Sequence, residues 1–538
     1  MAWARWAVVH SRALRLWHRS QWERCFQLRW LALLLLLAAV VRLAIAFWLI
    51  DADAMWSIDG GTYLINRDAW FGIEHDVVMH SRPPLAPGIA LYPFTLAFGD
   101  NGGLRVWSIV GSLFLVGASY YMVRAFFDPV KAVLFASIVS ADFWLLENMG
   151  AGAIVLYALA LLCVVLRGLL DWGYSTTSTA RLVLMSLALG LIPYVNQTVA
   201  GMALITLPVL FFVLLYMRWR DKVELLPLPV AAAIAAAVIL ALPSMPWYLA
   251  VAPGGDSVRF GGRLLQLGPS FFFEWFVWLF WVMTLWVTWP LARREKWGAV
   301  FWTVLAIMVP LMLLYSSDEA IMNFVWRSRY VASVVGAALI VGLLSRIWPG
   351  WKAACVWLVA SGSVSLFLML AWGGGNANSF SVFLRDDMSA TSWVDKQGDD
   401  LPIVVDGWGR ARFVASLTGR KVYTLRLWQF PHGAYDDIPR AFREENGVAF
   451  CVMGWGGLLS GSRCESRQLP SRGYILLNSE YSGLESVADR YLDDWYAALE
   501  HTNALPYTEL VWQRGDVYVW EFDTEATALH APASTTTD

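Results

Sequence analysis

Residues 51–103, which lie between the first two long apolar runs of the chain, hold a concentration of acids, histidines and arginines. The ionisable side chains in the first part of this segment are Asp51, Asp53, Asp59, Arg67, Asp68, Glu74, His75, Asp76, His80 and Arg82. A segment that only joined two apolar runs would need none of them, and ionisable groups beside a bilayer commonly mark a functional site. Carboxylates can take a proton and arginines can bind an anion, so this segment is the first candidate for chemistry.

Three short patterns in this segment have a spacing that can position side chains. Asp59 and Tyr63 lie one helical turn apart in a stretch that can form a short amphipathic helix. Arg82 precedes two prolines, which fix an extended turn and orient the arginine. The sequence Phe-Gly-Asp-Asn at residues 98–101 then leads to Arg105, where the next apolar run begins. Each has a plainer interpretation as well, with Asp59 as a helix N-cap and Arg82 as an interfacial arginine.

The elements that must position these residues are apolar segments long enough to cross a bilayer. Hydrophobic residues make up 58% of the 538-residue chain and charged residues only 15%, too few to cover the surface of a soluble protein. The net charge is -2, and the sequence has no basic stripe of the kind that binds nucleic-acid phosphates, so a nucleic-acid-binding protein is not expected. We predict about eleven membrane spans. They are residues 30–50, 104–123, 132–147, 149–166, 182–196, 198–217, 225–245, 271–291, 299–315, 330–345 and 353–372.

Lysines and arginines predict the orientation of these spans. Basic residues are frequent in segment 1–29 and in alternate loops after it, which places the N-terminus in the cytoplasm. In this register the loop 51–103 and everything after about residue 373 lie outside a plasma or inner membrane. We interpret segment 1–29 as a basic cytoplasmic segment that lies on the membrane surface.

The composition changes after the last predicted span, where a glycine-rich linker begins and charged residues become frequent. We predict a small extracytoplasmic α/β domain at residues 376–525, followed by a disordered tail at 526–538. Its predicted strands are 402–406, 421–425 and 517–522, and its predicted helices are 409–417 and 483–500. Cys451 and Cys464 belong to this part of the chain and could form a disulfide outside the cytoplasm or remain two buried thiols.

The order of the patterns in the loop resembles that of the GT-C glycosyltransferases. Asp-x-x-x-Tyr at Asp59, the Arg-Pro-Pro turn at Arg82 and Phe-Gly-x-Asn before Arg105 follow one another as they do in that family. Within the family, the chain is most similar to the protein O-mannosyltransferase and lipid A aminoarabinose transferase group. The resemblance covers residues 30–125 well and continues weakly to an Arg-Tyr pair at Arg329.

This resemblance implies both a fold and a reaction. The expected fold is a helical membrane bundle of residues 30–372 with a long first outer loop and a C-terminal outer domain, as hydropathy and charge also predict. The donor would be a sugar carried on a polyprenyl phosphate at the cell envelope. The acceptor would be a lipid, a glycan or a protein that arrives from the outer side. Attack at the anomeric carbon would displace the lipid phosphate, generally with inversion.

The resemblance also implies roles for single residues. Asp59 stands where the family has its catalytic aspartate, and a hydroxyl acceptor needs a carboxylate to take its proton. Arg82 stands where the family usually has lysine and would bind the leaving phosphate, because a guanidinium can hold phosphate through two hydrogen bonds. Arg105 and Arg329 are further candidates for contact with that phosphate.

Some positions leave alternatives open. Glu147 is the best match to a second acid that the family places in the next outer loop, and Asp142 is the alternative. Asp51 and Asp53 form an Asp-x-Asp, which binds a divalent metal such as Mg or Mn in other GT-C branches, whereas solvated carboxylates at the end of a span are more common. The chain departs from the family at Ser81, where an acid is frequent. The metal requirement and the sugar therefore stay open.

Other kinds of protein also fit the hydropathy. A transporter or flippase for a lipid or solute would carry ionisable residues inside its spans, but Arg42 and Glu274 are expected near span ends. A non-catalytic accessory subunit would have little use for the acid-rich loop 51–103. A third alternative keeps the GT-C fold and changes the reaction to ligation or polymerisation of a polysaccharide.

Overall fold

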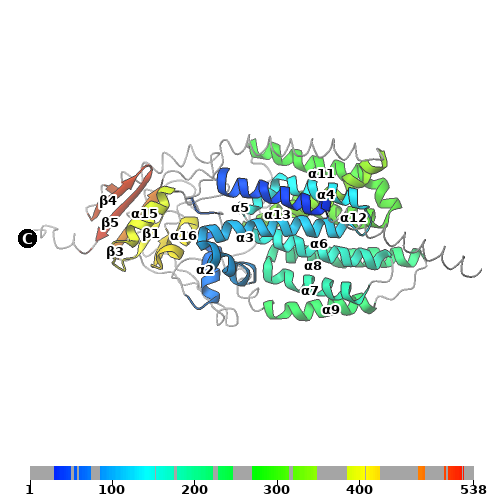
Figure 1. The fold of residues 1–538 in the computed structure, drawn as a ribbon, viewed down its shortest axis with the longest axis horizontal. Coiled ribbons are helices and arrows are strands. Elements are labelled where there is room, and N and C mark those ends of the chain that lie inside the picture. Colours follow the sequence, from blue (N-terminus) through cyan, green and yellow to red (C-terminus); the bar gives the residue numbers. More distant parts are fainter. Residues whose placement is uncertain are drawn as a thin grey trace, which may run out of the picture.

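The computed structural model describes fifteen stretches of the chain. They are residues 29–49, 54–56, 60–73, 85–151, 153–174, 178–221, 228–245, 269–313, 319–347, 385–405, 408–424, 471–478, 502–503, 507–523 and 525. These stretches form an elongated molecule with a helical bundle at one end and a small sheet at the other (Figure 1). Two short helices, α2 (Gly60–Trp70) and α16 (Trp408–Thr418), lie between the bundle and the sheet.

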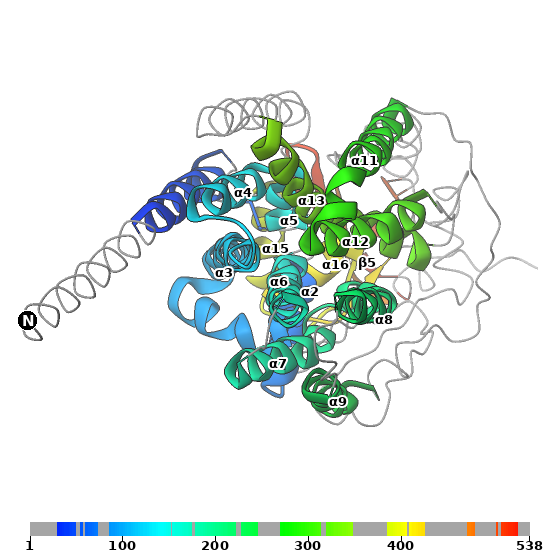
Figure 2. The same ribbon diagram turned by 90° about the vertical axis from the view of Figure 1, so that its right-hand side faces the viewer.

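The bundle is built from apolar helices. In chain order they are the helix Arg29–Trp48, α3 (Tyr92–Val123), α4 (Pro129–Ala141), α5 (Phe143–Ala151), α6 (Ala153–Tyr174), α7 (Thr179–Val195), α8 (Gln197–Arg220), α9 (Leu228–Ala241), α11 (Pro269–Arg294), α12 (Lys296–Leu313) and α13 (Glu319–Ile347). Short π-helical and 3-10 segments lie at Ile45–Leu49, at η2 (Leu85–Ala90) and at Leu242–Ser244. Helices α3 and α6 pack along each other in the middle of the bundle, and most residues of α6 are buried (Figure 2).

Five helices in the described part of the chain are long and apolar enough to cross a membrane. They are Arg29–Trp48, Tyr92–Val123, Ala153–Gly173, Gln197–Arg220 and Ser328–Ile347, and four shorter apolar helices accompany them. Every span predicted between residues 30 and 345 coincides with a helix, and the span predicted at 132–147 coincides with the two short helices α4 and α5. The span predicted at 353–372 lies outside the described residues. The number of membrane crossings therefore stays a prediction.

A buried arginine attaches the first helix to the bundle. The side chain of Arg42 is only 1% exposed, and its Nε donates to Ser112 Oγ on α3 at 2.7 Å. Its two terminal nitrogens donate to Ser140 on α4, one to Oγ and one to the carbonyl oxygen, each at 3.1 Å. Hydroxyl and carbonyl oxygens replace the water that a guanidinium would otherwise bind, which makes the charge tolerable among apolar helices.

The C-terminal part contains a five-stranded sheet in the order β2-β1-β3-β5-β4. The strands are β1 (Ile403–Val405), β2 (Val422–Thr424), β3 (Arg472–Asn478), β4 (Thr508–Arg514) and β5 (Val517–Asp523). Strand β1 pairs in parallel with β2 and β3, whereas β5 pairs antiparallel with β3 and β4. Helix α16 makes the crossover from β1 to β2, and helix α15 (Arg385–Asp395) packs beside it. All three residues of β1 are fully buried, because helices cover the parallel half of the sheet.

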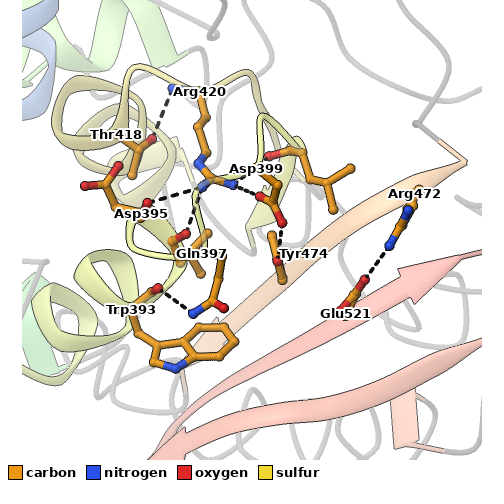
Figure 3. Close-up of polar contacts among 11 residues, drawn as sticks. Trp393, Asp395, Gln397, Asp399, Thr418, Arg420, Arg472, Tyr474 and Glu521 are labelled. Atoms are coloured by element: carbon orange, nitrogen blue, oxygen red, sulfur yellow. Dashed lines mark hydrogen bonds and ion pairs between the residues drawn. The ribbon is translucent and has the colours of Figure 1, made fainter.

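An arginine network ties these helices to the sheet (Figure 3). Arg420, which follows α16, donates to Asp399 Oδ1 at 2.6 Å and to the carbonyl oxygen of Val394 in α15 at 2.8 Å. The hydroxyl of Tyr474 on β3 donates to the other carboxylate oxygen of Asp399 at 2.7 Å. Burial tends to raise the pKa of Asp399, but hydrogen bonds from Tyr474 and Arg420 outweigh it and hold that pKa below its ordinary value. We interpret this network as structural.

The sequence predicted part of this fold correctly. The strands predicted at 402–406, 421–425 and 517–522 are confirmed, and so is the helix at 409–417, which ends at Gly419 with φ +66. Strands β3 and β4 and helix α15 were not predicted. The helix predicted at 483–500, the tail 526–538 and both C-terminal cysteines lie outside the described residues. A separate, extracytoplasmic domain at 376–525 stays a prediction.

Candidate functional site

Helix α2 begins at the residue that follows Asp59 in the chain. Its first seven residues, Gly60 to Asn66, are all buried, which is unusual for a short helix in a connecting loop. Its first turn is therefore held in a defined position, and with it the chain position next to Asp59. Four predicted site residues lie outside the described part of the chain: Asp51, Asp53, Asp59 and Arg82. The described elements that flank these residues in the chain are α2, α3 and the segment 54–56, and their contacts are described below.

Aromatic packing holds α2 against the bundle. The Tyr63 ring meets the Trp107 ring of α3 edge to face, with centroids 5.4 Å apart and planes at 69°. Trp107 in turn stacks on Tyr157 of α6 at 5.3 Å, and the Tyr157 hydroxyl donates to the Trp107 carbonyl oxygen at 2.7 Å. Such aromatic pairs contribute about 0.5–1.5 kcal/mol each beyond the area they bury. The tyrosine of the Asp-x-x-x-Tyr pattern thus anchors the helix that follows Asp59.

The Phe-Gly-Asp-Asn pattern at 98–101 forms the bend of α3 that faces the loop. Gly99 has φ +70, a left-handed conformation that glycine adopts without steric cost and that interrupts α3. The next residue, Asp100, forms an ion pair with Arg67 near the end of α2. Arg67 also contacts Asp68, its neighbour in the chain, with 2.7 Å between Nε and Oδ1. Helix α2 is therefore tied to α3 near its C-terminal end as well as through Tyr63.

Asn101, the last residue of that pattern, holds the segment that precedes Asp59. Its Nδ2 donates to the Ala54 carbonyl oxygen at 3.0 Å, and its Oδ1 accepts the Trp56 amide N–H at 2.9 Å. Trp56 is fully buried, and its indole Nε1 donates to Ser108 Oγ at 3.0 Å and to the Met149 carbonyl oxygen at 3.1 Å. The chain is thus fixed three residues before Asp59 and again immediately after it.

Arg105 also holds the segment 54–56, through hydrogen bonds to backbone carbonyl oxygens. Its side chain is 1% exposed, and its terminal nitrogens donate to the carbonyl oxygens of Ala46 and Ala54, the latter at 2.7 Å. Its guanidinium carbon lies 5.5 Å from the centroid of the Trp56 ring. These bonds join the end of the first helix to the beginning of the loop, so they give Arg105 a positioning role. Its contact with a lipid phosphate stays a prediction.

The two acids predicted near the second outer loop lie on either side of a helix start. Asp142 precedes α5, and its carboxylate Oδ1 accepts the Leu145 amide N–H at 3.0 Å, as a helix N-cap does. Glu147 belongs to α5 itself, two residues before Met149, whose carbonyl oxygen accepts the Trp56 indole. Helix α5 therefore brings the position of Glu147 close to the loop that contains Asp59, and the choice of Glu147 as the second acid stays a prediction.

The last predicted phosphate ligand lies on another helix. Arg329 belongs to α13 and is 7% exposed, with its guanidinium carbon 4.9 Å from the centroid of the adjacent Tyr330 ring. The described residues contain no group of three or more His, Cys, Asp or Glu arranged to hold a metal ion. The predicted metal ligands Asp51 and Asp53 lie outside the described residues. The described residues therefore neither support nor exclude a metal site at this pair.

One contact of α2 was not predicted from the sequence. Arg412 and Phe413 of α16 lie against Gly61 and Thr62, and Arg412 Nη1 donates to Thr62 Oγ1 at 2.6 Å. The two partners of this hydrogen bond are 350 positions apart in the chain. The sequence offers only one hint of a close approach, the Gly60-Gly61 pair at the start of a helix.

Comparison with solved structures identifies the fold. Apo ArnT from Cupriavidus metallidurans superposes with a TM-score of 0.55 over 93% of this chain and 99% of that chain, at 12% sequence identity. The same protein bound to undecaprenyl phosphate gives a TM-score of 0.53 over 90% and 97%, again at 12% identity. This chain has the fold of ArnT. The likeness covers both the bundle and the C-terminal part.

ArnT belongs to the aminoarabinose transferase group that the loop resembles, and at this sequence identity the likeness shows the fold alone. The five long apolar helices support a membrane protein. No protein-family model and no curated protein matches the chain. No comparison therefore assigns the chain to a family.

Proposed function

We propose that this chain is a membrane glycosyltransferase that takes a hexose or pentose from a polyprenyl phosphate and transfers it, with inversion, to an acceptor on the outer face of the membrane. The observation that supports this most is the shared fold with ArnT, a protein crystallised with undecaprenyl phosphate. The acid-rich loop supports the proposal too, because three residues of the pattern shared with the GT-C family make contacts that the structure describes. Asn101, Tyr63 and Arg105 all hold elements next to Asp59.

In the proposed reaction, Asp59 takes the proton of the acceptor hydroxyl as its oxygen attacks the anomeric carbon. The bond between that carbon and the phosphate oxygen breaks, and the polyprenyl phosphate leaves with the bonding electrons. Arg82 stabilises the charge on the leaving phosphate, assisted by Arg105 and Arg329. Glu147 acts as the second acid, which orients the acceptor or the base. If transfer requires Mg or Mn, the Asp-x-Asp pair of the loop, Asp51 and Asp53, supplies its proposed ligands.

The proposed topology has about eleven spans with a cytoplasmic N-terminus. It places α2, the loop and the C-terminal sheet on the outer side. The fold is compatible with this arrangement because α2 and α16 lie together at the end of the bundle nearest the sheet (Figure 1). Cysteine labelling from either side of sealed vesicles, at Ser471 next to β3 and at Asp128 before α4, tests it. The proposal expects Ser471→Cys to be labelled from the outside and Asp128→Cys from the inside.

The experiment that tests the catalytic proposal compares two carboxylates of the same loop. Purified protein is supplied with a panel of polyprenyl-phosphate sugars and a membrane extract as the source of acceptor. Asp59→Asn is expected to lower the rate by at least about a hundredfold, the lower end of the contribution of a general base. Asp76→Asn, a matched change in the same loop, is expected to leave the rate within about twofold. Equal rates for Asp59→Asn and wild type would contradict the assignment of the base.

A further inference from the structure

Helix α16 of the C-terminal part packs directly on the first turn of α2. A Cβ atom added at Gly61 would lie 2.7 Å from the backbone nitrogen of Phe413 and 2.8 Å from the carbonyl carbon of Arg412. Real Cβ atoms do not approach backbone this closely, so any side chain other than hydrogen at residue 61 must push the two helices apart. The two backbones are in contact two residues after Asp59.

A buried hydrogen bond fixes the relative position of these helices. Arg412 Nη1 donates to Thr62 Oγ1 at 2.6 Å, with Thr62 fully buried and Arg412 5% exposed. A hydrogen bond from a charged donor in a buried site is stronger and more directional than one in water. It adds a specific polar contact to the close approach at Gly61.

The same turn of α2 also contacts the bundle. A Cβ atom at Gly60 would lie 3.1 Å from Leu104 Cδ1 of α3 and 3.0 Å from Phe413 Cζ of α16. Phe413 and Leu104 are both fully buried. The first turn of α2 is therefore enclosed between a helix of the bundle and a helix of the C-terminal part.

We infer that α16 positions the catalytic base. By fixing Gly61 and Thr62, Arg412 and Phe413 set where the chain can place Asp59, so the C-terminal part helps to complete the active site. Arg412 and Phe413 are positioning residues and touch neither sugar nor phosphate. This inference rests on the proposed function, because it gives the C-terminal part a task in the transfer reaction itself.

The kinetic parameters separate this role from two others. If the C-terminal part only selected the acceptor, variants at the contact would raise KM for the acceptor and leave kcat unchanged. If the contact only stabilised the fold, less protein would fold, but kcat per folded molecule would stay the same. A displaced base lowers kcat with little change in KM, and a displacement of about 1 Å can cost roughly a hundredfold in rate.

The test uses full-length protein with changes on each side of the contact. Gly61→Ala is expected to lower kcat by at least about tenfold in folded, monodisperse protein, because the added methyl must displace α2 or α16. Gly117→Ala in α3 is the matched control, since no atom of the described residues outside its own helix lies within 4 Å of the added Cβ position, and it should keep wild-type kcat. Arg412→Met and Thr62→Val should each lower kcat, the double variant should fall no further, and Arg412→Lys should recover part of the loss.

A second readout does not depend on activity. The Cβ position at Gly61 lies 2.9 Å from Arg412 Cβ, and a disulfide needs about 3.5–4.5 Å. Because a side chain at residue 61 pushes the two helices apart, cysteines at positions 61 and 412 come into this range and should form a disulfide that mass spectrometry detects. Absence of the disulfide in folded protein would refute the contact. Wild-type kcat in folded Gly61→Ala and Arg412→Met would overturn this inference alone. If the cysteine variant forms the disulfide but the wild-type protein transfers no sugar, both the proposed function and this inference are overturned.

Discussion

The contact between Asn101 and the start of the loop makes a quantitative prediction. Asn101→Ala removes the acceptor for the Trp56 amide N–H and the donor to the Ala54 carbonyl oxygen. Each such bond contributes about 0.5–1.5 kcal/mol net, so the segment 54–56 should lose about 2 kcal/mol of stability relative to its opened state. Arg105 keeps its own bond to Ala54 but loses Asn101 Oδ1 as the acceptor of its Nε at 3.3 Å, a long bond that adds little to the loss. Since 1.4 kcal/mol corresponds to a factor of ten, opening should become roughly thirtyfold more frequent.

Hydrogen exchange read by mass spectrometry measures this directly. A peptide that covers residues 54–56 should exchange the Trp56 amide roughly thirtyfold faster in Asn101→Ala than in wild type. Sugar transfer should fall in the same variant, because the segment that leads to Asp59 is no longer fixed. Asn503→Ala is the control: it removes one hydrogen bond, from the Trp520 indole at 2.8 Å, in the C-terminal sheet. It should leave both the exchange of 54–56 and the transfer rate unchanged.

The reasoning would be refuted if Asn101→Ala left Trp56 exchange within about twofold of wild type, since the predicted loss of about 2 kcal/mol would then be absent. Faster exchange combined with an unchanged transfer rate would refute only the claim that the segment 54–56 positions Asp59. It would show that the segment before Asp59 can open without moving the base.

Two further predictions concern the sheet and the bundle. Hydrogen bonds from Tyr474 and Arg420 outweigh burial and keep the pKa of Asp399 low, so the stability it contributes is fully present above the unfolded-state pKa of about 3.9 and is lost as pH falls through the lower folded value. Exchange of the β1 amides between pH 7 and pH 3 should show this loss, and Asp399→Asn should remove it. Gly336→Ala should destabilise the bundle by about 1–3 kcal/mol, because its Cβ would overlap the Trp281 ring. An unchanged melting temperature would contradict that packing.

The helices were predictable because a membrane span must be apolar along its length. The spans predicted at 198–217 and 271–291 became α8 (197–220) and α11 (269–294). The beginning of α3 was missed, because the polar, glycine-containing sequence at 98–103 interrupts the apolar run while the helix continues across a bend at Gly99. Arg42 was expected near the end of a span. Its burial against hydroxyls of two other helices depends on packing that hydropathy does not contain.

In the C-terminal part, local pattern was sufficient only for some elements. Strands β1 and β5 are apolar runs, and both were predicted. Strand β4 is partly exposed along its length and lies at the edge of the sheet, so its sequence lacks a strong buried face. Helix α15 is short and polar, and its packing against the sheet decides its conformation.

For the candidate site, the sequence indicated a loop but not the contacts that hold the elements beside it. The patterns at Asp59 and at 98–101 were recognised, whereas the reason for the asparagine became clear only from its two bonds to the segment 54–56. The contact between Thr62 and Arg412 joins residues 350 positions apart. Local sequence spacing cannot predict this contact, because it arises from the packing of α2 against α16, two helices that are distant in the chain.

The measurement that tests the central claim most directly is the fate of the donor. Purified wild-type protein in lipid vesicles is given a polyprenyl-phosphate sugar with both parts labelled. The proposed function predicts that labelled polyprenyl phosphate is released while the sugar appears on an acceptor, and that Asp59→Asn lowers both by at least about a hundredfold. Movement of intact donor across the bilayer, with no cleavage for any sugar tested, would contradict the claim and would indicate a transporter.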